Sequence, residues 1–167
     1  MGYIAALLVA FAALPILLVV YIQLARAKRH RRTQQEVWGA IANRRGGRFH
    51  ATGTGFNHHQ MSIPLRLGEA RVMVFSGVVL DRAIASDYRH NGGWFTHVIL
   101  SLPTPGRRFA VTDRRLDALG NRAFVVSGGN AITAVLPGCV LDPARIEAAL
   151  WLVDEVSVTP PTAAAAA

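Results

Sequence analysis

The chain has 167 residues, of which 51% are hydrophobic, and it carries 18 Lys and Arg against 10 Asp and Glu, a formal net charge of +8. Its length suits one domain of ordinary size, with a core that needs no metal or disulfide. The single cysteine, Cys139, excludes an intramolecular disulfide and any multi-cysteine zinc or iron–sulfur site. Lysine-dependent chemistry is limited to Lys28, because every other basic residue among the 18 is arginine.

The amino-terminal segment is apolar. The first 25 residues contain no charged side chain, and residues 3–25 are interrupted only by Pro15 and Gln23. As a helix, residues 3–25 would rise about 34 Å, enough for a hydrocarbon core of about 30 Å. We therefore expect a single transmembrane helix. A cleaved signal peptide is the alternative, but such a peptide needs a basic stretch before its apolar core, and none is present.

A basic collar, residues 26–32, follows directly. It contains five fixed positive charges: Arg26, Lys28, Arg29, Arg31 and Arg32. Basic residues flanking a span stay on the cytoplasmic side. The pattern therefore predicts a bacterial-type, single-pass protein of the inner (cytoplasmic) membrane, with its amino terminus outside and the rest of the chain cytoplasmic.

Small residues recur on one face of the predicted span. Gly2, Ala6 and Ala10 repeat every four residues, and Ala13 continues that face. Small side chains at this spacing let another helix approach closely, and Pro15 is expected to bend the helix by removing one backbone hydrogen bond. These five residues form the predicted helix-packing site. The alternative is that the repeated small residues only reflect how common alanine is in such helices.

A second helix is predicted to begin at Thr33. This residue stands three positions before Glu36, which is the spacing of a capping box, and Trp38 and Ile41 supply an apolar stripe behind it. The two glycines at residues 46–47 can end this helix. An alternative is that the helix is continuous with the apolar segment, so that the basic collar is itself helical.

The remaining chain indicates an α+β domain. We expect closely spaced strands at residues 61–67, 71–80, 94–102, 109–112, 122–127 and 131–136, the last of which could also begin a helix. Strands without intervening helices favour an antiparallel meander. A closing helix is predicted after Asp142, which can cap it, and Pro143. The predicted organisation is a transmembrane anchor at residues 1–25, the basic collar, a cytoplasmic domain at residues 33–158 and a flexible tail at residues 159–167.

No catalytic, cofactor-binding or metal site is predicted. The six histidines match no metal-binding spacing. The glycine-rich residues 52–56 lack the Gly-Lys-Ser/Thr that follows in a phosphate-binding loop, and Val125 stands where a nucleophile elbow around Ser127 requires glycine. We therefore expect a protein that is not an enzyme and that needs no cofactor.

The charge distribution indicates an anionic partner. Residues 33–140 carry a net charge of +6 and residues 141–167 a net charge of −3. The candidate site for an acidic protein or anionic lipid headgroups comprises the basic collar together with Arg107, Arg108, Arg114 and Arg115. A solvated arginine-rich surface is the alternative. Nucleic acid is not expected as a partner, because no recognition motif accompanies the charge.

The function predicted from these features is that of a non-enzymatic accessory subunit or assembly factor of a larger integral-membrane complex, such as a respiratory or photosynthetic one. Its span and its basic domain would brace integral-membrane protein partners. The alternative is a membrane-anchored module that senses a ligand or binds lipid, with Tyr88, Trp94, Phe95 and His97 around a pocket.

Overall fold

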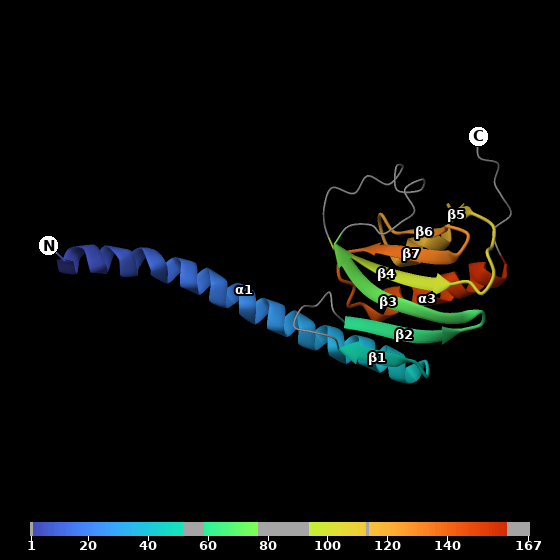
Figure 1. Ribbon diagram of the computed structural model, residues 1–167, viewed down its shortest axis with the longest axis horizontal. Coiled ribbons are helices and arrows are strands. Elements are labelled where there is room, and N and C mark those ends of the chain that lie inside the picture. Colours follow the sequence, from blue (N-terminus) through green and yellow to red (C-terminus); the bar gives the residue numbers. More distant parts are fainter. Residues whose placement is uncertain (1, 52–58, 77–93, 113, 160–167) are drawn as a thin grey trace.

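The computed structural model describes residues 2–51, 59–76, 94–112 and 114–159, with the backbone alone for residues 2–13 and 76. A long helix leads into a seven-stranded sheet, and a second helix closes the domain (Figure 1). In chain order the elements are α1 (Gly2–Arg44), β1 (Arg48–Ala51), β2 (His59–Leu65), β3 (Gly68–Ser76), β4 (Trp94–Ser101), β5 (Phe109–Val111), the 3-10 helix η2 (Arg114–Leu119), β6 (Phe124–Ser127), β7 (Ala131–Pro137) and α3 (Pro143–Val158).

Helix α1 runs without a break for 43 residues, about 64 Å. Its carboxyl-terminal end packs on the domain, and its amino-terminal part extends far beyond the sheet (Figure 1). The predicted start at Thr33 is wrong, because the Thr33 hydroxyl donates a hydrogen bond to the carbonyl of Arg29 at 3.1 Å inside the helix, and Glu36 pairs with Arg32 at 3.2 Å. The alternative of one continuous helix is confirmed. The helix ends, as expected, at a left-handed glycine, Gly46, with φ 66°.

The predicted transmembrane anchor, and with it the single-pass orientation in the inner membrane, is contradicted. Within the residues that the structure describes, none of the helices combines the length and the apolar character that crossing a membrane requires. The physical reason is the position of the charges. The basic collar opens at Arg26, directly after Ala25, so that five charged side chains follow the apolar stretch on the same helix.

The sheet is antiparallel, with the strand order β1-β2-β3-β4-β7-β6-β5. The first four strands form a meander; β1 was not among the predicted strands, and the predicted meander does not continue beyond β4. The chain then crosses to the far edge and returns strand by strand, so that β7 pairs with β4. Residues 131–136 are confirmed as strand, and a turn at residues 128–130 joins β6 to β7. The turn between β2 and β3 comes earlier than the predicted strands at 61–67 and 71–80 imply, because Leu65 pairs with Gly68.

The two faces of the sheet differ in their burial. One face packs against α3 and the carboxyl-terminal part of α1 around a large core that includes Trp38, Ile41, Val98, Leu136 and Leu150. The other face carries a smaller cluster of buried side chains: Phe95, Phe124, Val126 and Val135. The expected α+β class, an antiparallel sheet flanked by two helices, is therefore confirmed.

The segment between β7 and α3 is held by hydrogen bonds from both sides. The Thr96 hydroxyl donates to the carbonyl of Gly138 at 2.8 Å and accepts from the amide of Val140 at 2.9 Å. The indole Nε1 of Trp38 donates to the carbonyl of Val140 at 3.1 Å. Helix α3 then begins as predicted, with an Asp142 carboxylate oxygen accepting from the amide of Ala144 at 3.0 Å. This segment thus connects α1, β4 and α3.

Replacing Thr96 by valine tests this connection. Thr96→Val keeps the shape of the side chain but leaves the buried amide of Val140 and the carbonyl of Gly138 without their partner, which should lower the free energy of unfolding by about 2 kcal/mol. Thr112→Val, at an exposed position, is the matched control and should change it by less than about 0.5 kcal/mol. Urea denaturation measures both, and equal stability of the two variants would contradict the assigned role.

Candidate functional site

The most unusual surface lies on the part of α1 that extends beyond the sheet. We call residues 14–25 the apolar arm. Its large hydrophobic side chains are exposed on every side of the helix, with Leu17 65% and Tyr21 70% exposed. The exposed set is Leu14, Ile16, Leu17, Leu18, Val19, Val20, Tyr21, Ile22 and Leu24. Exposed apolar patches of this extent mark interaction sites, and a helix that is apolar all round is normally surrounded by other protein or lipid.

The predicted helix-packing residues lie on the same helix. Pro15 is inside α1 and belongs to the apolar arm. Gly2, Ala6, Ala10 and Ala13 lie on the helical backbone before it, but their side chains are outside the described part of the structure. Their packing role stays a prediction.

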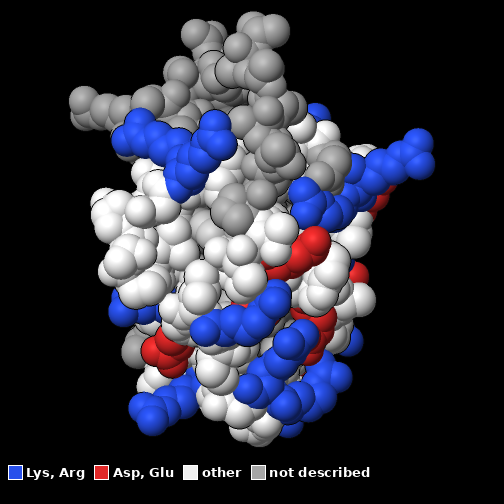
Figure 2. Space-filling view, turned by 90° about the vertical axis from the view of Figure 1, so that its right-hand side faces the viewer, with Lys and Arg blue, Asp and Glu red and all other residues white. Residues whose placement is uncertain are grey.

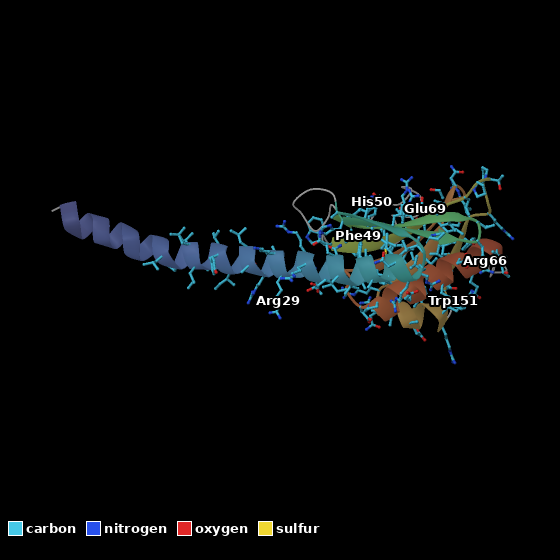
Figure 3. The ribbon with its side chains drawn as sticks, turned by 90° about the horizontal axis from the view of Figure 1, so that it is seen from below. Arg29, Phe49, His50, Arg66, Glu69 and Trp151 are labelled. Carbon is cyan, nitrogen blue, oxygen red and sulfur yellow. The ribbon has the colours of Figure 1, made fainter. Side chains whose placement is uncertain are left out.

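The basic collar follows the apolar arm as part of the same helix. Arg26, Lys28, Arg29 and Arg32 are exposed, whereas Arg31 is half-buried. Figure 3 shows Arg29 on the part of α1 outside the domain, pointing away from the sheet, whereas Phe49, Arg66 and Trp151 come from the domain itself. Apolar and cationic surfaces therefore succeed one another along one helix.

The other predicted basic residues do not join the collar. Arg107 and Arg108 precede β5, and Arg114 and Arg115 begin η2, at the edge of the sheet opposite to β1 and α1. Arg115 forms an ion pair with Glu155 of α3 at 3.3 Å. β5 is a three-residue edge strand, and flanking charges are a common protection of such an edge against pairing with another chain. The predicted basic residues therefore lie in two places, on α1 and beside the β5 edge of the sheet.

The acidic residues near the carboxyl terminus have partners within the domain. Glu147 accepts hydrogen bonds from Arg44 and Arg45, and Asp154 binds Arg66 at 2.8 Å. Figure 2 shows the basic side chains on the end of the domain facing away from the amino terminus, with acidic side chains between them. Much of the negative charge of α3 therefore holds the domain together, which leaves the collar as the basic surface next to the apolar arm.

A pocket of about 500 Å³ lies where α1 leaves the domain. One wall is formed by α1, from Gln23, Arg26, Ala27 and His30, and the other by Trp94, Gly138 and Cys139. The second wall is fixed by the backbone, because the amide of Gly138 donates to the carbonyl of Trp94 at 2.7 Å.

The residues proposed for a sensing pocket are not gathered in one place. Trp94 lines the pocket, 40% exposed. Phe95 belongs to the small cluster on the other face of the sheet, and the His97 ring meets the Phe75 ring edge-on at 5.1 Å on that same face. Tyr88 lies outside the described residues. The sequence pattern did not identify the other residues as lining a pocket. Gln23, Ala27 and His30 do, however, recur at the helical spacing that also includes Trp38.

Two of the features considered above for metal binding or catalysis can be placed in the described part of the chain. The described residues contain no group of three or more His, Cys, Asp or Glu side chains placed to hold a metal ion. Ser127 has a structural role in the β6–β7 turn, where its hydroxyl accepts from the amide of Gly129 at 3.3 Å. The glycine-rich residues 52–56 and His58 lie outside the described ranges.

Comparison with known proteins places the chain in no family: it matches no family model, no curated protein and no solved structure.

The reactivity of Cys139 tests the pocket wall. Burial raises the pKa of its thiol from 9.0 to about 11. Because only the thiolate reacts, alkylation by iodoacetamide should be slow at pH 8 and should accelerate about tenfold per pH unit up to pH 10. The chain unfolded in urea serves as the control, and its rate should level off near pH 9. A rate that levels off near pH 9 in the folded protein as well would contradict the burial of this thiol.

Proposed function

We propose that this protein is a non-enzymatic accessory subunit or assembly factor that binds a larger complex through α1. The observation that carries the proposal is the apolar arm, which the domain itself leaves uncovered. Burying one large aliphatic side chain contributes about 1.5–3 kcal/mol. Several such side chains, buried together, can support stable association even after the entropy lost on binding.

The shape of the surface restricts the kind of partner. Because the exposed side chains of the arm surround the helix, one flat partner surface would cover only part of them. A partner with several apolar helices, as in an integral-membrane complex, could pack around the arm. This packing does not require α1 to cross a bilayer.

The basic collar adds an electrostatic preference. Its five positive charges begin where the arm ends, and only Arg32 has an ion pair that the structure records there, with Glu36. An acidic surface on the partner, or anionic lipid headgroups beside it, would complement the positive charge of the collar. The folded domain would then stand outside the contact and brace it.

Three substitutions on one side of the arm test the proposal. The variant Leu14→Gln, Leu17→Gln, Leu24→Gln removes apolar surface without adding charge and should weaken association at least about a hundredfold. The matched control, Leu67→Gln, Trp151→Gln, Val158→Gln, changes exposed apolar residues of the domain and should associate normally.

The measurement is native electrophoresis of the tagged full chain after extraction in mild detergent. The unchanged protein and the domain control should migrate in a complex of fixed stoichiometry, and the arm variant should migrate alone. A protein that migrates alone without any substitution, or an arm variant that stays in the complex, would contradict the proposal.

A further inference from the structure

The pocket between α1 and the β7–α3 segment has the size and chemistry of a ligand site. Its volume of about 500 Å³ is within the range of about 300–1,000 Å³ that is common for small-molecule sites. The pocket shares Gln23 with the apolar arm, but none of the exposed hydrophobic side chains of the arm lines it, and its occupancy does not depend on the docking function proposed above.

The two walls of the pocket have different chemistry. Arg26 and His30 stand one helical turn apart, so both polar groups lie on the same side of α1. Ala27, the exposed ring of Trp94 and Gly138 present apolar surface to the same space. The described lining contains no acidic side chain. A ligand that satisfies both parts needs an anionic head and an apolar body.

The surrounding charge strengthens this preference for an anion. Arg29, Arg31 and Arg32 continue the basic collar beyond Arg26 on the same helix, and the nearest acidic residue along α1, Glu36, is paired with Arg32. An anionic head in the pocket would therefore lie in the positive potential of the basic collar. A guanidinium group such as that of Arg26 can bind a carboxylate through two parallel hydrogen bonds.

We propose that this pocket binds a single-chain carboxylate amphiphile of the fatty-acid type, with its carboxylate at Arg26 and His30 and its chain along Ala27 and Trp94. The cavity suits one chain of about twelve carbons rather than a lipid with two acyl chains. The site is rigid on one side, because the Thr96 hydroxyl and the Trp94 carbonyl hold residues 138–140. A ligand there would fix the direction in which α1 leaves the domain.

Cys139 provides a site-specific readout, because it is the only cysteine of the chain and it lines the pocket. A probe that binds elsewhere, for example along the apolar arm, would leave its alkylation unchanged. The probe is dodecanoate, kept below its micelle concentration, and the measured quantity is the ratio of alkylation rates at pH 9 without and with the probe. At ten times its Kd, dodecanoate should slow the reaction about tenfold.

Two control compounds separate the contributions of head and chain. Dodecyl maltoside has the same chain without a charge, and acetate has the carboxylate without the chain. Neither should protect Cys139 at the concentration at which dodecanoate does. Equal protection by dodecyl maltoside, or protection by acetate, would overturn the assignment of an amphiphilic anion.

Three pairs of variants locate the site. Arg26→Gln should raise the dodecanoate concentration for half-protection about fivefold, whereas Lys28→Gln, which removes the same charge outside the pocket, should not. Trp94→Ala should raise it, and Trp151→Ala, on exposed α3 surface, should not. Ala27→Phe should abolish the effect by filling the pocket, and Ala40→Phe on an exposed part of α1 should preserve it.

The outcome is decisive in either direction. Protection that responds to the pocket variants and ignores their controls supports the site. Absence of protection, or equal behaviour within each pair, overturns it. Circular dichroism of each variant, compared with the unchanged protein, detects a loss of folding. If one pocket variant does not fold, the remaining pairs decide whether the site exists. Failure here would leave the native-gel result for the apolar arm unaffected, and the reverse also holds.

Discussion

The packing of Trp38 into the core of the domain is the contact on which the other features depend. Its ring is fully buried in the core, and its Nε1 donates to the carbonyl of Val140, in the same segment that Thr96 holds to the sheet. This contact attaches the carboxyl-terminal end of α1 to the domain. Because α1 is one continuous helix, the same contact also determines where the basic collar and the apolar arm are placed.

The electrostatic organisation follows from this attachment. Arg44 and Arg45 at the end of α1 share Glu147 of α3, while Arg66 and Arg115 use Asp154 and Glu155. Such partly exposed pairs contribute little each, about 0–1 kcal/mol. These ion pairs also occupy the acidic side chains of α3 within the domain. The collar then remains as the cationic surface beside the arm, available to an outside anion.

Local signals in the sequence predicted most elements correctly. The apolar spacing of Trp38 and Ile41, the strand from Trp94 and the cap at Asp142 depend on near neighbours. The start of a helix at Thr33 failed because helical residues on both sides outweigh one capping signal, and the predicted membrane span was wrong. The pairing of β4 with β7 and the pocket bring together residues far apart in the chain, which no local pattern encodes. The spacing of Gln23, Ala27 and His30 was the signal that could have indicated the pocket wall.

Docking by the apolar arm and the position of the pocket both require that α1 is continuous through the basic collar. Backbone chemical shifts measured by NMR on the full chain test it directly. A continuous α1 should give helical Cα shifts at every residue from Arg29 to Glu36, with Thr33 inside the helix. Extended or cap-like shifts at Arg32 and Thr33, with a new helix beginning after them, would contradict it.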